Sequence, residues 1–390
     1  MNENVSPEAI IGKPGINLEI EYLRAIAILM VVLVHSENFF PPSGFGQWTG
    51  VDLFFCISGY VISRAFEPFF DKHIAEGRWW TAARAFWVRR IFRLAPSAWL
   101  WLAVSVFCSW SFNQSGWFRA FDDNLRTAAY FLAFITNFAL AHGSVHSNGH
   151  YWSLTLEDQF YFAFPFFLFL FRRHWRWLTF LLLIFLQSIP DRSITERYPG
   201  YFWVTRLDAL MWGCLIYQFS RSALYWKLEP VFCRFRIIAL AINVALIYCL
   251  IKLPTGFFGP YIGSNAESKI ALASAGLVFL ASFERGYVLP VPRPLQAVLA
   301  WIGARSYGIY LIHIAVFGFA QEIWLRCLPF LGQDPPGRLY MYAAVALVLT
   351  PVLAELNFRY IETPMRKVGV RMANRILTKP EPRLQPQAAE

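Results

Sequence analysis

The sequence predicts an all-α integral membrane protein, with about ten transmembrane helices and one re-entrant or interfacial segment around a polar cavity. Of its 390 residues, 57% are hydrophobic and 15% are charged, whereas soluble domains have roughly 45–50% apolar and about 25% charged residues. The apolar residues also gather in runs of about 20, the length that crosses ~30 Å of hydrocarbon. Most Lys and Arg residues fall between these runs, so the net charge of +10 indicates membrane orientation and gives no reason to expect nucleic acid.

Ten apolar runs are predicted to cross the bilayer, at residues 18–36, 49–66, 94–112, 151–171, 175–190, 201–219, 236–252, 267–283, 305–325 and 339–358. An eleventh run, 125–142, is shorter and is interrupted by Thr136 and Asn137. If it crossed, the basic clusters at 172–176 and 221–236 would face outward, against the positive-inside rule. We therefore expect it to dip in and return against protein or a wet cavity, with both termini cytoplasmic.

The chain divides by composition into three parts. Residues 1–17 form a polar tail without a cleavable signal peptide, 18–367 the transmembrane domain, and 368–390 a basic cytoplasmic tail with a disordered end. The six cysteines include no C-x-x-C pair, and most lie in apolar runs, so we expect no disulfide framework.

The first two spans carry polar residues at compatible depths. Arg24 and His35 are eleven residues apart, which is three helical turns plus about 20°, so they share one face about 16 Å apart along the axis. They could form a polar stripe in which His35 acts as an acid or base. Alternatively, Arg24 is a snorkelling anchor and His35 an interfacial residue. Asp52 could orient the imidazole or simply stabilise a helix start.

Three arginines, Arg89, Arg90 and Arg93, precede the third predicted span, with Pro96 expected in the first turn of that helix. This charge could be ordinary positive-inside charge. It could also clamp phosphates, because guanidinium groups bind phosphate oxygens bidentately.

Further polar residues interrupt the later spans. Glu157 and the adjacent Asp158 are difficult to explain as core residues, and Glu157 is the stronger functional candidate. Arg206 and Asp208 are two residues apart and point to opposite helix faces, so each needs a partner on another helix. For Arg206 we expect Glu157 or Asp52.

Ser306, Tyr310 and His313 are predicted to share one helix face, which is either functional or a tight seam with Gly308. The sequence contains no P-loop, H-E-x-x-H, G-x-S-x-G or G-x-G-x-x-G motif. This argues against an ATPase, a zinc protease, an α/β hydrolase and a Rossmann enzyme.

Seven motifs occur in order along residues 17–367. They are Arg24-x10-His35, GVDLFFCISGY, RRIFRLAP, WSLTLEDQFY, RLDALMWG, SYGIYLIH and RYIETP. Together they resemble the membrane-bound acyltransferase family 3, bacterial proteins that O-acylate surface polysaccharides, lipopolysaccharide, peptidoglycan and some small glycosides. Asp158 departs mildly from the family pattern, in which a second Glu is commoner.

The resemblance implies transfer of an acyl group, expected to be acetyl, from acyl-coenzyme A to a hydroxyl of a carbohydrate or glycolipid acceptor. It also implies a multi-pass protein of the bacterial cytoplasmic membrane, with a polysaccharide synthesis or export complex as a partner. The arginine–histidine motif of the family maps to Arg24 and His35, and its cytoplasmic arginine motif maps to Arg90 and Arg93. Its Ser-x3-Tyr motif resembles Ser306 and Tyr310.

On this interpretation His35 is the general base, held by Asp52 or Glu157, and no metal is needed. The predicted site residues are His35, Asp52, Glu157, Arg206 and Tyr310 for catalysis, Arg24, Arg89, Arg90, Arg93 and Ser306 for the coenzyme, and Trp152, Asp208 and His313 for the acceptor. Transfer through an acyl-histidine or acyl-tyrosine is an alternative. The competing classes are a transporter or channel that uses the same polar residues as a path, and a scaffold in a synthase complex.

Overall fold

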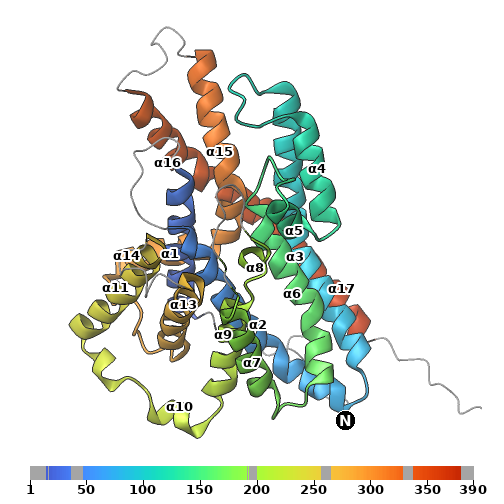
Figure 1. Cartoon of the computed structure of the whole chain (residues 1–390), viewed down its shortest axis with the longest axis vertical. Helices are drawn as coiled ribbons and strands as arrows, with labels where there is room; N and C mark the ends of the chain where they lie inside the picture. The colour runs from blue at the N-terminus through green and yellow to red at the C-terminus, as the bar shows by residue number, and fades with distance from the viewer. Residues whose placement is uncertain are drawn as a thin grey trace, which may run out of the picture.

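Helices account for all regular secondary structure in the described part of this computed structural model (Figure 1). The structure describes residues 15, 17–36, 47–190, 192, 200–255, 265–327 and 337–378. The helices of the first half are α1 (Leu18–His35), η3 (Gln47–Thr49), α2 (Gly50–Ala75), α3 (Trp79–Ser111), α4 (Phe121–Leu132), α5 (Thr136–Ala141), α6 (Tyr151–Leu170) and α7 (Arg176–Ser188). Those of the second half are α8 (Tyr201–Val204), α9 (Asp208–Ser220), α10 (Ala223–Lys227), η4 (Val231–Arg234), α11 (Arg236–Lys252), η5 (Leu253–Thr255), α13 (Ala266–Ser282), α14 (Arg293–Ala304), α15 (Ser306–Cys327), α16 (Gly337–Asn357), η7 (Phe358–Glu362) and α17 (Thr363–Thr378).

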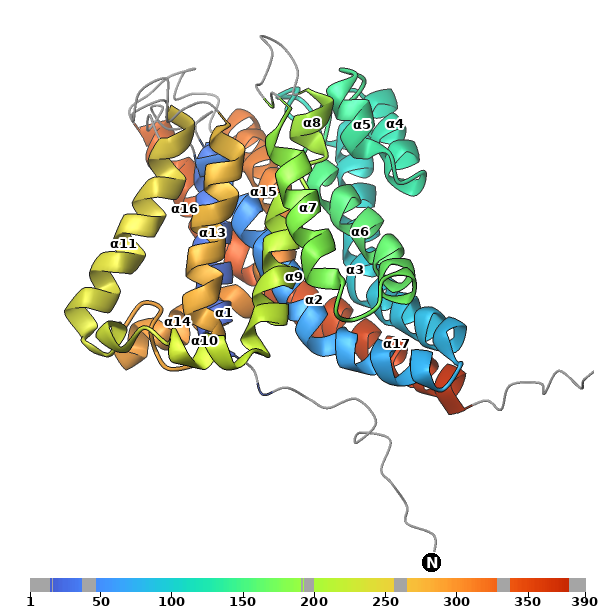
Figure 2. The ribbon, with the colours of Figure 1, turned by 60° about the horizontal axis from the view of Figure 1, so that its bottom comes forward.

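The long helices run between two ends of the molecule (Figure 2). The start of α1 lies at the lower end in this view, together with α10, α14 and α17. Helices α4, α5 and α8 lie at the upper end. The N-terminal half of α1 and the loop region around α4 therefore belong to opposite ends.

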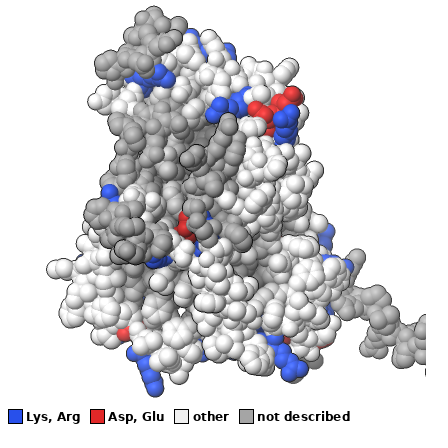
Figure 3. Space-filling model, viewed as in Figure 1, with Lys and Arg blue, Asp and Glu red and all other residues white. Residues whose placement is uncertain are grey.

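Five helical stretches of the described residues are long and apolar enough to cross a membrane, namely Gly50–Ala75, Trp79–Ser111, Arg236–Thr255, Ser306–Cys327 and Gly337–Thr378. The other predicted spans coincide with α1, α6, α7, α9 and α13, which are shorter, less apolar or more charged. The face shown in Figure 3 is largely uncharged, and its charged side chains gather in small groups. The chain is thus an all-α membrane protein.

Helix α3 corrects one local prediction. It is continuous over 33 residues, Trp79–Ser111, so Pro96 lies in its interior and not in a first turn. At ~1.5 Å per residue, α3 is about 50 Å long and exceeds the ~30 Å hydrocarbon core. The three arginines of the RRIFRLAP motif consequently lie in the middle of a helix.

The structure shows how three further predicted segments divide into helices. The expected span 201–219 is interrupted between α8 and α9, which places Arg206 in the break. The segment 125–142 is divided between α4 and α5, with Phe134 at φ 57° in the turn between them, and both helices lie at the upper end in Figure 2. Residues 368–378, expected in the tail, continue α17, and 379–390 lie outside the described residues.

Helices α2 and α9 pack with their backbones in close approach. A Cβ atom added to Gly59 of α2 would overlap the carbonyl of Leu210, and one added to Gly213 of α9 would overlap the carbonyl of Cys56. Small residues allow this approach in membrane proteins, where helices associate through van der Waals packing. The close approach holds α2 in a fixed position relative to α9.

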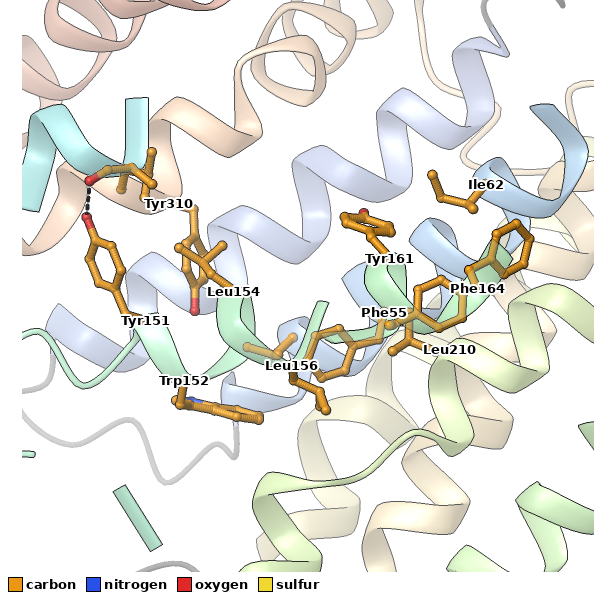
Figure 4. Packing of buried hydrophobic residues seen from close by; sticks show 14 of the residues in the cluster. Phe55, Ile62, Tyr151, Trp152, Leu154, Leu156, Tyr161, Phe164, Leu210 and Tyr310 are labelled. Atoms are coloured by element: carbon orange, nitrogen blue, oxygen red, sulfur yellow. Dashed lines mark hydrogen bonds between the residues drawn. The ribbon is translucent and has the colours of Figure 1, made fainter. Parts of the chain in front are cut away.

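The core around α6 holds the helices that carry the site. Figure 4 shows Phe55 of α2, Leu210 of α9 and Tyr310 of α15 together with the row of apolar side chains from α6. The hydroxyl of Tyr151 donates a 2.8 Å hydrogen bond to the carbonyl of Ala98 on α3.

The start of α1 is fixed by polar side chains. The side-chain oxygen of Asn17 caps the helix by accepting from the amides of Glu19 and Ile20, and its Nδ2 donates to the carbonyl of Ala281 at 2.9 Å. The buried carboxylate of Glu19 accepts from the amides of Gly286 and Val288 at 2.8 and 2.7 Å. These contacts fix the position from which Arg24 and His35 project.

Candidate functional site

A cavity of about 450 Å³ lies among α1, α2, α3, α6, α14, α15 and the turn from η7 into α17. Its charged lining residues are Arg24, Arg90, Arg93, Arg366, Glu21, Glu157 and Glu362. The four arginines exceed the three glutamates by one formal charge. Much of the remaining wall is apolar, which is typical of a ligand pocket with a few placed polar groups.

The arginines of the cavity are held by different contacts. Arg90 is buried, and its guanidinium faces the ring of Phe66 at 5.1 Å and that of Tyr161 at 5.2 Å. Arg24 forms an ion pair with Glu21 at 2.7 Å. Of the three arginines predicted on α3, Arg90 and Arg93 line the cavity, whereas Arg89 is not among its lining residues.

Basic residues of α17 extend this charge beyond the cavity. Arg366 lines the cavity and also a neighbouring surface hollow, whose other lining residues are Lys367, Val370 and Arg371. In the sequence-based division of the chain, Lys367 ends the membrane domain and Arg371 belongs to the tail. The sequence feature that could have indicated their place beside the cavity is the basic amphipathic pattern of residues 363–378, which predicts a helix lying on a surface.

Glu157 lies on the cavity wall, held by hydrogen bonds from the hydroxyls of Ser58 and Tyr161. The carboxylate therefore joins α6 to α2 inside the cavity. The neighbouring Asp158 is not among the lining residues, as expected for adjacent positions on a helix.

Hydroxyl groups line the cavity near α15. Ser153, Ser306 and Tyr310 all contribute to its wall. The hydroxyls of Ser153 and Tyr310 are 2.6 Å apart, and Tyr310 also donates to the carbonyl of His150 at 2.8 Å. Tyr310 thus connects the cavity to the segment that begins α6.

Three histidines cluster behind Tyr310. The ring centroid of His313 is 4.9 Å from that of His35 and 5.3 Å from that of His150. The fold brings together His35 and His313 as predicted site residues, but His150 was not predicted. Its sequence signal is its position immediately before the Tyr-Trp-Ser run that opens α6.

Backbone hydrogen bonds define the tautomer of two of these histidines. Nδ1 of His35 lies 2.8 Å from the carbonyl of Val31, and Nδ1 of His313 lies 2.7 Å from the carbonyl of Tyr310. Because a carbonyl only accepts, each Nδ1 carries the proton, and the lone pair of the neutral ring is on Nε2. Both imidazoles can then accept a proton at Nε2.

A buried ion cluster lies outside the cavity lining. Arg206 pairs with Asp52 at 3.2 Å, and Asp52 is one of the two partners that the sequence predicted for it. Asp208 pairs with Arg192 at 2.9 Å. All four side chains are buried and do not line the cavity, so this cluster links α2 to α9 and to the chain before α8.

Four predicted site residues lie in or against this cluster. Arg206 lies against the rings of Trp48 and Trp152, 4.7 and 5.1 Å from their centroids, and is not among the lining residues of the cavity. Trp152 is buried against Arg206. Asp208, which was expected to contact the acceptor substrate, forms an ion pair with Arg192. Asp52, which was expected beside His35, forms an ion pair with Arg206.

No group of three or more His, Cys, Asp or Glu side chains in the described ranges has the arrangement that would hold a metal ion. The ring of His313 packs edge to face against the rings of His35 and His150. All six cysteines are free thiols.

The helical fold and the polar site within it define a membrane protein with an internal cavity that joins an arginine-rich wall to the hydroxyls of Ser153 and Tyr310. The ring of Tyr310 contacts that of His313 in the histidine cluster. The chain belongs to the membrane-bound acyltransferase family 3, because the family model described as an acyltransferase domain matches residues 17–355. No solved structure matches the chain.

Curated relatives agree with this family. The chain is 27% identical to the Peptidoglycan O-acetyltransferase OatA of Listeria monocytogenes, over 90% of this chain and 56% of the relative. It is also 27% identical to the "Putative peptidoglycan O-acetyltransferase YrhL" of Bacillus subtilis, over 90% of this chain and 55% of that protein. The chain thus spans little more than half the length of these relatives.

Proposed function

We propose that the protein transfers an acyl group, expected to be acetyl, from acyl-coenzyme A to a hydroxyl of a cell-envelope carbohydrate. The observation that carries this proposal is that one cavity is lined both by arginines and by hydroxyl groups. The arginines are Arg24, Arg93 and Arg366, and the hydroxyls are those of Ser153 and Tyr310, next to the histidine cluster. Its acyltransferase family and its resemblance to peptidoglycan O-acetyltransferases support the same chemistry.

The arginine wall suits the phosphates of the donor, because guanidinium and phosphate groups form bidentate, charge-assisted hydrogen bonds. The single excess positive charge of the cavity is small for a polyphosphate. The basic side chains of α17 supply more, since Arg366, Lys367 and Arg371 border the hollow beside it. We place the nucleotide end of the donor there, with its pantetheine arm directed along the apolar wall toward Tyr310.

The proposed reaction is direct. The acceptor hydroxyl oxygen attacks the thioester carbonyl carbon while its proton passes to Nε2 of His35, the nitrogen with the lone pair. The C–S bond then breaks, and the proton moves to the leaving thiolate. Such a base typically contributes ~10²–10⁴-fold, and the hydroxyls of Tyr310 and Ser153 would stabilise the oxyanion.

We also propose ten membrane crossings, by α1, α2, α3, α6, α7, α9, α11, α13, α15 and α16, with both termini on the cytoplasmic side of a bacterial inner membrane. The distribution of basic residues supports this orientation. The donor would then enter from the cytoplasm, where acyl-coenzyme A is made.

The test of the base is His35→Ala. We expect ester-linked acyl groups on the envelope glycans of the producing cell to fall at least ~100-fold, measured by mass spectrometry after mild alkaline release. The protein should still insert and bind donor. His142→Ala changes an exposed histidine outside the cluster and should leave acylation unchanged. Full acylation by His35→Ala would refute the assignment of the base.

A transporter or channel remains the competing class, and coenzyme A distinguishes it. The enzyme predicts that acetyl-coenzyme A raises the unfolding temperature of the purified protein in detergent, because a ligand that binds only the folded state stabilises it. The Arg93→Ala variant should lose most of that shift. No shift at millimolar coenzyme would favour transport.

A further inference from the structure

A second cavity, of about 400 Å³, lies on the other side of the histidine cluster from the arginine wall. It is formed by the end of α3, the loop before α4, the loop before α6 and the middle of α15. Among its lining residues His146, Gly116 and Arg119 are exposed, so the cavity reaches the surface. Asn124 of its lining belongs to α4, a helix at the upper end of the molecule in Figure 2, opposite the start of α1.

Hydroxyl and amide groups dominate the polar part of this cavity. Its lining includes Asn124, Asn148, Ser105, Ser115 and Ser147. Among the described lining residues, Arg119 is the one Arg or Lys, and no Asp or Glu is present. Nδ2 of Asn148 donates to Oδ1 of Asn124 at 2.8 Å, and the hydroxyl of Ser105 donates to Oδ1 of Asn148 at 3.3 Å. Such groups, which both donate and accept, recognise neutral hydroxyl-rich ligands.

The backbone of this cavity is held in an unusual conformation. Asn148 has φ 48° and Arg119 has φ 59°, in the left-handed region that non-glycine residues seldom adopt. Asn148 is positioned by its contacts with α3 and α4, and it lies two residues before His150. The loop is thereby shaped around the cavity and leads directly to the histidine cluster.

His150 and His313 lie along the chain between residues of the two cavities, and we call them the histidine partition. Gly149 and Ile314, the chain neighbours of His150 and His313, line the second cavity together with Ala315. On the other side, Ser153 and Tyr310 line the arginine cavity. The Nε2 atoms of His150 and His313 are buried, and neither forms a hydrogen bond among the described residues. An unmade hydrogen bond of this kind is destabilising, and a ligand hydroxyl at the partition would offset that loss.

We propose that this second cavity, around Asn124, Asn148 and His146, binds the neutral carbohydrate acceptor and presents its hydroxyl to the histidine partition. The proposal rests on the proposed acyl transfer and assigns the acceptor to the side opposite the donor arginines. The acceptor oxygen forms the new bond to the acyl carbon, the C–S bond of the donor breaks, and the hydroxyl proton passes to an imidazole Nε2.

The test places a removable block at the mouth of the cavity. In a Cys327→Ser background, which removes an exposed thiol, His146→Cys is labelled on intact cells with a bulky membrane-impermeant methanethiosulfonate. We expect envelope O-acylation to fall at least ~10-fold on labelling and to recover with a reductant. Thermal stabilisation of the purified, labelled protein by acetyl-coenzyme A should be unchanged, because His146 does not line the arginine cavity.

The matched control is Asp122→Cys, an exposed position on α4 that does not line the cavity. Its labelling should leave acylation intact. The proposal is overturned if His146→Cys acylates fully when mass spectrometry shows complete labelling, or if the thiol is inaccessible from outside. Low acylation of His146→Cys before labelling, with normal donor stabilisation, supports an acceptor role. If cells carrying His35→Ala acylate normally, the proposed chemistry fails independently of this cavity.

Discussion

At the scale of the residue, the chemistry of the site depends on which nitrogen of each imidazole is protonated. The carbonyls of Val31 and Tyr310 accept from Nδ1 of His35 and His313 and leave Nε2 as the basic atom of each ring. Spacing in the sequence places these histidines on helix faces. It cannot show that the two rings meet at 4.9 Å.

Tyr310→Phe should test the oxyanion assignment. The substitution removes the hydroxyl that contacts Ser153 and the carbonyl of His150 while keeping the ring. We expect kcat to fall about 10²–10³-fold with little change in donor KM, as for the loss of an oxyanion donor. Measurement of initial rates in membrane vesicles with acetyl-coenzyme A would check this, and an unchanged kcat would remove Tyr310 from the mechanism.

The pair formed by Asp52 and Arg206 makes a stability prediction. Removal of one member of a buried ion pair costs about 3–5 kcal/mol, because it leaves an uncompensated charge. Asp52→Asn and Arg206→Gln should each destabilise the protein, and the double variant should lose at least ~1 kcal/mol less than their sum. The free energy of unfolding by dodecyl sulfate titration measures this coupling.

A surface pair provides the control for that cycle. Arg64 and Glu284 also form an ion pair, but both side chains are partly exposed, so their coupling should be at most about 1 kcal/mol. Equal coupling in the two cycles would show that burial does not strengthen the Asp52–Arg206 interaction.

At the scale of the element, the close contact between α2 and α9 positions Asp52 opposite Arg206. We expect Gly213→Val to separate these helices, because even a Cβ would overlap the carbonyl of Cys56. The cost of overpacking is typically about 1–3 kcal/mol. Gly337→Ala is the control, since a Cβ there meets nothing within 4 Å. Comparison of unfolding midpoints in detergent tests the prediction, and equal midpoints would contradict it.

Helix α17 makes a prediction about the donor. Arg366→Ala should raise the donor KM about 10-fold or more, because a hydrogen bond to a charged group contributes about 1.5–3 kcal/mol. The effect should weaken at high salt, since exposed charges are screened. Arg375→Ala changes a basic residue of the same helix outside both hollows and should have little effect. A change in kcat alone would place Arg366 elsewhere in the reaction.

At the scale of the whole molecule, orientation can be measured with single cysteines. In the Cys327→Ser background, Asp122→Cys on α4 should react with an impermeant thiol reagent added to intact cells. Lys227→Cys on α10 should react only after the membrane is opened, because the positive-inside rule places that basic segment in the cytoplasm. Reaction of both from outside would contradict the proposed ten crossings.

The sequence predicted the membrane class well because it depends on composition and run length alone. It was less successful where local pattern and tertiary packing disagreed. Pro96 was predicted in the first turn of a helix but lies inside the long α3. The apolar run 201–219 was predicted as one helix, but the helix is interrupted at Arg206. An internal proline and a break in a helix both leave backbone polar groups without their helical hydrogen bonds. Inside a membrane such groups are tolerated where neighbouring helices supply hydrogen-bond partners.

The sequence by itself determined an all-α membrane protein of the acyltransferase family 3, with Arg24, His35, Glu157 and Tyr310 as candidate site residues. Only the tertiary structure decided that His150 joins the histidines, that Arg206 is held between Asp52 and two tryptophans, and that residues close in sequence to His150 and His313 line two separate cavities. Periodicity assigns a side chain to a face of its own helix. Which groups meet across helices depends on close backbone contacts such as those at Gly59 and Gly213, whose effect appears only when the helices pack.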